Sequence, residues 1–273
     1  MSEQKTSKLN QLLSLLDDAS VVSSRWLRAQ GYSSSLVVRY VASGWLQSPA
    51  RGVYCRRGAA LSWEGVVQSL QQREGLPLHV GGRYALAWEG HEHYLRMAET
   101  STITLYGAAR PPGWLNKLGL EERFQACGRG PFLPVDFPLA AETDDDRLFA
   151  SGLQRLDTSS NGDPVVFSTP ERAMLELCDL PPGAALVYEA DSVMQSLGGL
   201  RPALLDSILK DCRSIKAKRL FLALAERHQH AWLPHLQLEK LDLGTGKRSL
   251  VPGGRLHPKY HITLPADLDE QLG

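Results

Sequence analysis

The first 58 residues carry the pattern that most constrains the fold of this chain: three short amphipathic segments followed by two short extended ones. The first segment repeats leucine at the spacing of one helix face, at Leu9, Leu12, Leu13 and Leu16. We predict helices over residues 8–16, 25–30 and 35–43, because serines precede the second and third segments and glycines follow them. Two strands joined by a turn are predicted within residues 45–55. This order is typical of a winged helix-turn-helix, whose third helix enters the major groove of DNA.

The outward-facing positions of this module are the candidates for DNA contact. Ser34, Ser35 and Arg39 are expected at or near base edges, because they lie on the third helix. Arg51, at the tip of the wing, is expected against the DNA backbone or in the minor groove. The full set of candidate DNA-binding residues is Ser23, Ser24, Arg25, Arg28, Ser33, Ser34, Ser35, Val38, Arg39, Arg51, Arg56 and Arg57. The alternative for each arginine is a solvated surface charge, and for the serines it is helix capping.

The charges are distributed unevenly, although the net charge of the whole chain is zero. Residues 1–58 contain eight Lys and Arg against three Asp and Glu, which gives a net charge of +5. Residues 59–150 carry −4 and residues 151–273 carry −1. A basic segment at one end of the chain indicates a polyanionic partner for that end only, unless it is simply a solvated basic face.

The remaining residues, 59–273, are predicted to form a larger α+β domain, joined to the winged helix-turn-helix domain of residues 1–58 by a hinge near Gly58. Helices are expected over residues 63–73, 170–178, 188–195, 202–212 and 216–228. Strands are expected at residues 78–80, 84–86, 94–95 and 103–106, and in the tail at 236–238, 249–250 and 260–264. The expected fold class is therefore α+β, with the winged helix-turn-helix at the N-terminal end.

Composition excludes several classes of protein. Apolar residues make up 43% of the chain and charged residues 22%, so a sizeable core can form and disorder of the whole chain is excluded. No stretch approaches the roughly 18 apolar residues of a membrane span, and residues 1–9 lack the apolar part of a signal peptide. The cysteines lie far apart, at Cys55, Cys127, Cys178 and Cys212, which favours reduced thiols. We therefore expect a cytoplasmic protein that does not bind a membrane.

Motifs for catalysis and metal binding are missing or incomplete. The histidine clusters are His91-x-His93 and His228-x-His230, with His235 nearby. No cysteine lies at zinc-finger spacing, so we predict no metal site. The sequence has no G-x-S-x-G and no complete Walker motif, and residues 243–248 are expected to form a hairpin turn with two exposed cations. Asp144-Asp145-Asp146 is expected in a solvated loop. We therefore predict no catalytic residue and no cofactor, and expect that the protein is not an enzyme.

The order of several short motifs resembles the AbiEi-type antitoxins, the repressor half of type IV toxin–antitoxin systems. In the first module these motifs are Leu12-Leu13, Trp26-Leu27-x-x-x-Gly31-x-Ser33, Gly44-Trp45-Leu46 and Arg51-Gly52-Val53-Tyr54. Further along they are Val80-Gly81-Gly82-x-x-Ala85-Leu86, Gly90-His91-x-His93-Tyr94-Leu95, Ser168-Thr169-Pro170-Glu171-Arg172-Ala173, Gly246-Lys247-Arg248, Gly253-Gly254 and Lys259-Tyr260-x-Ile262-x-Leu264-Pro265. No single motif is specific, but their order spans most of the chain.

The resemblance implies two functions. The N-terminal domain of this family binds inverted repeats in the promoter of its own operon and represses it. The C-terminal domain counters a co-expressed nucleotidyltransferase toxin, without a stable protein–protein complex, and no catalysis by the antitoxin is implied. In the C-terminal segment, Lys247, Arg248 and Lys259 are candidates for an antitoxin surface that binds RNA, a substrate or a partner. Their alternative is plain solvated charge.

Two other functions fit a winged helix joined to a larger domain. One is a nucleic-acid-processing enzyme that the winged helix directs to its target, and clustered carboxylates with a lysine would favour it. The other is a ligand-sensing transcriptional regulator, and an apolar pocket with convergent polar groups in the C-terminal domain would favour it.

Overall fold

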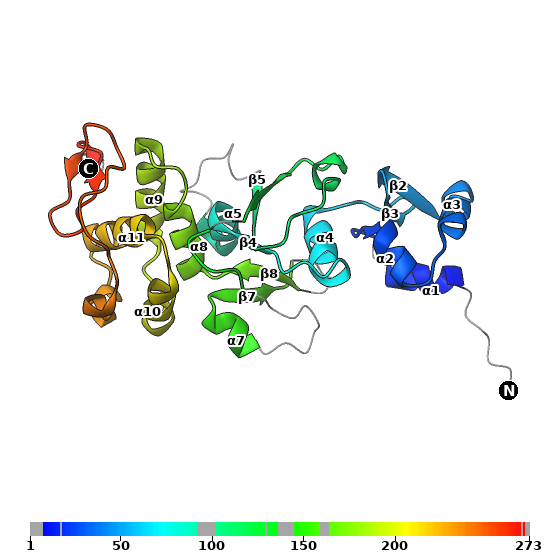
Figure 1. The fold of residues 1–273 in the computed structure, drawn as a ribbon, viewed down its shortest axis with the longest axis horizontal. Coiled ribbons are helices and arrows are strands. Elements are labelled where there is room, and N and C mark those ends of the chain that lie inside the picture. Colours follow the sequence, from blue (N-terminus) through cyan, green and yellow to red (C-terminus); the bar gives the residue numbers. More distant parts are fainter. Residues whose placement is uncertain are drawn as a thin grey trace.

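The computed structural model describes residues 8–16, 18–91, 102–128, 130–135, 145–158, 164–268 and 270. The molecule is elongated, with the N-terminal module at one end and the segment after α11 at the other (Figure 1). A mixed sheet with its helices lies between these ends. Among the described residues, no helix has the length and apolar character needed to cross a membrane.

The N-terminal module is a winged-helix-like unit, as the order of its elements predicts. Its helices are α1 (Lys8–Leu15), α2 (Ser24–Ala29) and α3 (Ser34–Ala42), and its strands are β1 (Val22–Ser23), β2 (Leu46–Ala50) and β3 (Val53–Arg56). The strands form an antiparallel sheet in the order β1-β3-β2. Its core is Leu12, Leu16, Val22, Leu27, Tyr32, Val37, Tyr40 and Leu46. Of the predicted leucine stripe, Leu12 and Leu16 are buried and Leu9 packs against this core, whereas Leu13 is half-buried and does not belong to it.

Serine and glycine fix the ends of these helices. The hydroxyl of Ser23 accepts a hydrogen bond from the Trp26 backbone N–H (3.1 Å), and the hydroxyl of Ser33 accepts one from the Leu36 N–H (3.3 Å). Gly44 follows α3 with a φ of +73°, a conformation that favours glycine. Strand β2 runs on to Ala50, so the wing turn is narrower than predicted and consists of Arg51 and Gly52.

The module packs against α4 (Trp63–Gln68), which continues into a π-helical turn over Ser69–Arg73. The backbone N–H of Val21 donates to the buried hydroxyl of Ser69 (3.1 Å). Gly65 allows this approach, because a Cβ there would overlap the carbonyl group of Ala19. Val21 and β3 residues also share one hydrophobic core with α4. Packing therefore crosses the expected hinge near Gly58.

The central sheet is mixed and has the order β6-β5-β4-β8-β7. Its strands are β4 (His79–Gly81), β5 (Thr102–Tyr106), β6 (Arg123–Cys127), β7 (Leu153–Leu156) and β8 (Val165–Ser168). β4 runs parallel to β8 and antiparallel to β5. β5 runs parallel to β6, and β7 runs antiparallel to β8.

The remaining helices pack against this sheet or lie between it and the C-terminal end of the molecule. They are α5 (Gly82–Leu86), α7 (Asp145–Ala150), α8 (Pro170–Cys178), α9 (Ala184–Ser196), α10 (Pro202–Asp211) and α11 (Ile215–Arg227). A π-helical turn covers Ala87–His91, and 3-10 turns cover Leu115–Lys117, Leu233–His235 and Leu238–Lys240. α8 is central, because it contacts α9, α10 and α11 as well as β4 and β8. The short strands β9 (Arg255–Leu256) and β10 (Thr263–Leu264) pair near the C-terminal end.

Some predicted elements are wrong. Residues 84–86 lie in helix α5 rather than in a strand, because Gly82 turns the chain directly after β4 with a φ of +57°. Residues 236–238 belong to a segment of 3-10 turns. Residues 243–248 do not form a hairpin, since Arg248 makes an isolated parallel bridge to Ile262. Asp145 and Asp146 begin α7 instead of extending a loop, and the expected strand at 94–95 and Asp144 lie outside the described residues.

The close packing at Gly65 gives a stability prediction. Gly65→Ala places a methyl group against the Ala19 backbone, so we expect unfolding free energy to fall by about 1–3 kcal/mol, as for other overpacked contacts. Urea unfolding followed by circular dichroism measures it. Gly198→Ala is the matched control, because a Cβ at Gly198 meets no atom within 4 Å. Equal stability of the two variants would contradict the close contact.

Candidate nucleic-acid interface

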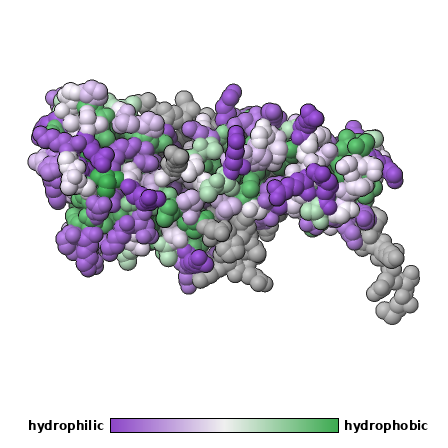
Figure 2. Space-filling model, viewed as in Figure 1, coloured by the Kyte–Doolittle hydropathy of each residue, from purple (hydrophilic) through white to green (hydrophobic). Residues whose placement is uncertain are grey.

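The outer face of α3 is free for contact with a partner. Ser34, Ser35, Val38 and Arg39 are exposed, whereas Val37 and Tyr40 point into the core. The sequence periodicity predicted this division, because the exposed and buried positions alternate with the period of a helix. In the space-filling view, apolar surface over α3 lies beside hydrophilic side chains at this end of the molecule (Figure 2). The face presents short hydroxyl and aliphatic side chains together with one arginine.

The segment that contains α3 is rich in arginine and free of acidic residues. Between Asp18 and Glu64 the chain has no Asp or Glu, and it has six arginines. Those with exposed side chains are Arg25 and Arg28 on α2, Arg39 on α3, Arg51 in the wing turn, and Arg57 after β3. Exposed positive charge of this kind attracts phosphate.

Several candidate residues make contacts within the protein. Ser23 is 7% exposed and its hydroxyl caps α2, while its backbone N–H donates to Glu74 (3.2 Å). We therefore remove Ser23 from the proposed DNA surface. Arg56 forms an ion pair with Asp18 (2.9 Å), which offsets part of its charge. Ser24 is half-buried, and its backbone N–H donates to the Gly52 carbonyl (2.8 Å), so it links α2 to the wing.

The candidate residues for an antitoxin surface lie at the opposite end of the molecule from α3 (Figure 1). Lys247 and Arg248 are exposed, and the Arg248 backbone N–H donates to the His261 carbonyl (2.9 Å). Lys259 differs, because its ammonium group forms an ion pair with Glu226 (2.8 Å). That pairing raises the pKa of Lys259 above its ordinary value, so the side chain stays charged but partnered.

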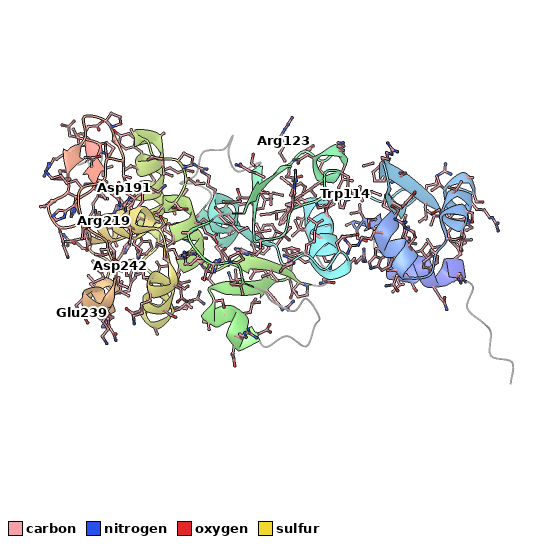
Figure 3. The ribbon with its side chains drawn as sticks, viewed as in Figure 1. Trp114, Arg123, Asp191, Arg219, Glu239 and Asp242 are labelled. Atoms are coloured by element: carbon pink, nitrogen blue, oxygen red, sulfur yellow. The ribbon has the colours of Figure 1, made fainter. Side chains whose placement is uncertain are left out.

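Arg219 holds the backbone that presents Lys247 and Arg248, and sequence reasoning missed it. Its guanidinium, on α11, donates to the carbonyls of Leu243 (2.6 Å), Gly244 (3.0 Å) and Gly246 (2.7 Å) (Figure 3). Arg219 is buried, with 2% of the residue exposed. Arg219 stands just before the apolar run 220–225 of α11, and the sequence gave no signal for its role because its acceptors lie 24 to 27 residues further along the chain.

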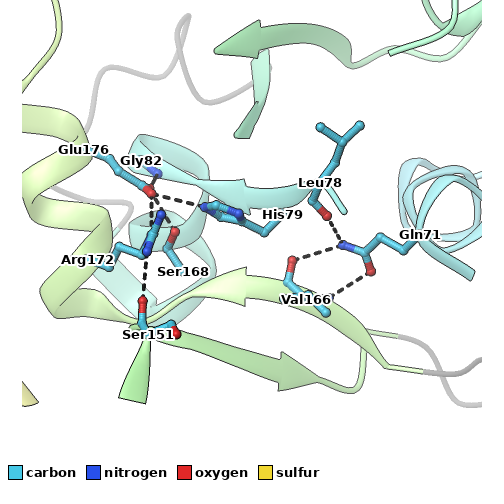
Figure 4. Close-up of polar contacts among 9 residues, drawn as sticks. All are labelled: Gln71, Leu78, His79, Gly82, Ser151, Val166, Ser168, Arg172 and Glu176. Carbon is cyan, nitrogen blue, oxygen red and sulfur yellow. Dashed lines mark hydrogen bonds and ion pairs between the residues drawn. The ribbon is translucent and has the colours of Figure 1, made fainter. Parts of the chain in front are cut away.

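A buried polar cluster around Glu176 of α8 lies where the sheet meets the helices (Figure 4). One oxygen accepts from Arg172 (2.9 Å) and faces the His79 imidazole (3.2 Å). The other accepts from the Ser168 hydroxyl (2.8 Å) and from the backbone N–H of Gly82 (2.9 Å). Arg172 also donates to the Ser151 carbonyl (2.8 Å). Serine, histidine and a carboxylate therefore meet here, but the serine donates to the carboxylate and not to the histidine, so they do not form a nucleophile activated by a base.

Burial, hydrogen bonds and neighbouring charges together set the pKa values of Glu176 and His79. Burial alone raises the pKa of Glu176, but hydrogen bonding to His79 and the charge of Arg172 bring it below its ordinary value. Burial lowers the pKa of His79, against the effect of its hydrogen bond to Glu176. The cluster therefore pairs a buried carboxylate with a guanidinium, and burial disfavours a positive charge on the adjacent imidazole. Such a cluster holds the strands and helices around it together. Removal of one partner would leave a buried charge without its counterion, which is strongly destabilising.

Three histidines of the sequence clusters make polar contacts within the protein. The His91 ring contacts the Ser196 hydroxyl (2.7 Å), His228 contacts Asp191 (2.8 Å), and His230 contacts the Met194 carbonyl (2.7 Å). In the part of the chain that the structure describes, no group of three or more metal-ligating side chains comes together. His93 lies outside that part. Burial raises the pKa of Cys212 to about 11, so this thiol stays protonated.

A surface hollow of about 440 Å³ lies between the end of α11 and the strands β9 and β10. Its lining is mixed, with Leu256, Leu264 and Leu268 beside charged and polar side chains. Its charged side chains already have partners, because Arg227 pairs with Asp191 (3.2 Å) and Glu226 pairs with Lys259. Among the described lining residues, these two charged side chains are therefore engaged with protein partners.

Comparison with protein families gives two matches that together cover most of the chain. Residues 100–265 match the model described as "Transcriptional regulator, AbiEi antitoxin, Type IV TA system". Residues 5–97 match the model of the AbiEi antitoxin N-terminal domain. The N-terminal match extends beyond the winged helix through α4, β4 and α5. No curated protein matches the chain.

Among solved structures, the crystal structure of the RV2827C protein from Mycobacterium tuberculosis has a similar fold. It aligns with a TM-score of 0.51 and 17% sequence identity, over 99% of this chain and 97% of that chain. The similarity therefore concerns the arrangement of elements over the whole length, from the winged helix to the C-terminal strands.

The Glu176 cluster gives the second stability prediction. Glu176→Gln removes the charge that balances buried Arg172, so we expect a loss of about 3–5 kcal/mol in unfolding free energy. Denaturant unfolding measures it, and Glu226→Gln is the control. Its ion pair with Lys259 is exposed, and loss of such a pair costs about 0–1 kcal/mol. A Glu176→Gln protein as stable as this control would show that the cluster does not hold the fold.

Proposed function

Because the chain belongs to the AbiEi family of antitoxins and transcriptional regulators of type IV toxin–antitoxin systems, we propose that it represses its own promoter and counters a nucleotidyltransferase toxin. In this proposal the winged helix binds inverted repeats in duplex DNA, and the C-terminal domain relieves toxicity without a stable complex with the toxin. The observation that carries the DNA-binding half is the exposed outer face of α3, which lies in a segment that has six arginines and no acidic residue between Asp18 and Glu64.

The geometry of the module suggests how contacts divide on DNA. α3 enters the major groove with Ser34, Ser35 and Arg39 toward base edges. Arg51, in the two-residue wing turn, reaches the adjacent backbone or minor groove. Arg25 and Arg28 on α2 lie against phosphates. Since one chain carries one winged helix, an inverted repeat takes two chains, one on each half-site.

The antitoxin half of the proposal concerns the far end of the molecule. Lys247 and Arg248 are exposed cations on a segment that Arg219 holds in place. We propose that they contribute to the surface that relieves toxicity, through an RNA, a substrate or a partner. Lys259 contributes less, since Glu226 already neutralises it.

We propose that this activity is regulatory rather than enzymatic and takes place in the cytoplasm, where the promoter lies. Membership of a family of transcriptional regulators supports this. So does the engagement of Ser168, His79 and Glu176 with one another in a closed structural cluster. An enzyme directed by the winged helix would need an accessible reactive group, and this cluster does not provide one.

The DNA-binding half is tested by gel shifts with the DNA upstream of the coding sequence and with a scrambled fragment. Arg39→Ala is expected to reduce discrimination between the two, by about 1–3 kcal/mol for a bidentate contact to a base. Arg51→Ala is expected to weaken binding to both fragments similarly, and all binding should weaken steeply with salt. Unchanged discrimination by Arg39→Ala would show that α3 does not read the bases.

The separation of the two activities is tested in the full-length chain, because a fragment of residues 59–273 would expose the face of α4 that packs against Val21. Expressed from a foreign promoter, Lys247→Ala/Arg248→Ala is expected to lose rescue of cells from the cognate toxin and to keep DNA binding. Arg39→Ala/Arg51→Ala is expected to show the reverse. Melting temperatures of both proteins should match the wild type, since all four side chains are exposed.

One result would contradict this division. If Arg39→Ala/Arg51→Ala loses rescue although it is well folded and the gene is driven from a foreign promoter, relief of toxicity runs through DNA binding alone. Loss of both activities in Lys247→Ala/Arg248→Ala would also contradict it.

A further inference from the structure

An aliphatic side chain stands in the middle of the outer face of α3. Val38 is 64% exposed, whereas the neighbouring aliphatic residue Val37 is 4% exposed. The exposed positions around Val38 are Ser34 and Ser35 one turn before it, Arg39 beside it, and Ala42 one turn after it. An exposed valine contributes nothing to the core of the module, so its surface is available for a partner.

The position of Val38 on the helix determines what it can meet. Residues at the edge of a groove-bound helix meet phosphates, and those on the central outward line meet the edges of bases. Val38 lies on that central line, between Ser34 and Ala42. A valine has no hydrogen-bonding group, so it recognises a base only through an apolar group. In the major groove that group is the C5 methyl of thymine.

The restricted conformation of a valine side chain also favours a specific contact with a base. A β-branched side chain in a helix has one strongly preferred χ1 rotamer, so Val38 is already ordered before binding. The neighbouring serines and alanine are short, and they do not keep the helix away from the floor of the groove. Its methyl groups can therefore approach a base closely, with little loss of side-chain entropy.

Resting on the proposed binding of DNA through α3, we propose that Val38 determines specificity by packing against the C5 methyl group of a thymine in each half-site. Arg39 supplies a hydrogen-bonding contact beside it, and Val38 supplies an apolar one. The two contacts are distinct, so they respond to different changes in the DNA.

The experiment compares DNA that has or lacks this methyl group. The fragment upstream of the coding sequence is amplified with dTTP or with dUTP, because uracil is thymine without the C5 methyl and keeps the same base pairing. Wild-type protein is expected to bind the dUTP fragment about fourfold more weakly for each half-site, as estimated from the burial of one methyl group. Two half-sites give about fifteenfold on the same basis.

Variants separate the methyl contact from other effects of uracil. Val38→Ala is expected to bind both fragments equally, with the affinity that the wild type has for the dUTP fragment. Arg39→Ala is the matched control on the same face, and it is expected to keep the difference between the two fragments while binding both more weakly. Val38→Ala should melt at the wild-type temperature, because the side chain is exposed.

Each of the other possible results contradicts a different part of the proposal. Equal binding of both fragments by the wild type overturns the methyl contact and leaves DNA binding intact. A difference that persists in Val38→Ala assigns it to DNA shape or to another residue, and overturns the role of Val38. Absence of binding to either fragment overturns the proposed DNA-binding function and this inference together.

Discussion

The buried carboxylate of Glu176 is the contact on which the body of the molecule depends. It joins α8 to β4 through His79, to β8 through Ser168, and to the start of α5 through Gly82. A carboxylate taken out of water without donors would cost several kcal/mol, so strands and helix must reach this arrangement together. The same carboxylate also requires glycine at position 81, because a Cβ on Gly81 would overlap the Glu176 carboxylate. The remaining strands take their places from β4 and β8.

The winged-helix module is attached to this body by packing and not only by covalent connection. The Ser69 hydroxyl accepts from the Val21 N–H (3.1 Å) and donates to the Gly65 carbonyl (2.6 Å), which ties the module to the first turns of α4. Arg73 adds a hydrogen bond to the Leu15 carbonyl (2.8 Å). The outer face of α3 lies away from these contacts (Figure 1). The same packing that orients the module therefore leaves its candidate DNA surface free.

Local patterns predicted the first module well, and distant contacts explain what they missed. The leucine stripe and the serine caps depend on residues within one or two turns, so α1, α2 and α3 could be predicted from the sequence. Helix α5 could not be predicted in this way, because the Gly82 N–H at its start donates a hydrogen bond to Glu176, which lies 94 residues further along the chain. The segment that Arg219 holds was missed for the same reason. Among the candidate site residues, charge and periodicity indicated which arginines are exposed. For Ser23 the sequence allowed both helix capping and DNA contact, and the structure shows the capping hydrogen bond.

The short side chains of α3 have a geometric consequence for any duplex it binds. Serine, valine and alanine extend only a few ångströms from the helix, so base contact by Ser34, Ser35 and Val38 requires the backbone of α3 to lie deeper in the groove than contact by Arg39 alone would. A helix with long side chains could read the same bases from further out. Binding through α3 would therefore select for groove width as well as for base identity. Bases that carry bulky groups in the major groove would keep the helix at the rim, and the chain would then hold such DNA only by its phosphates.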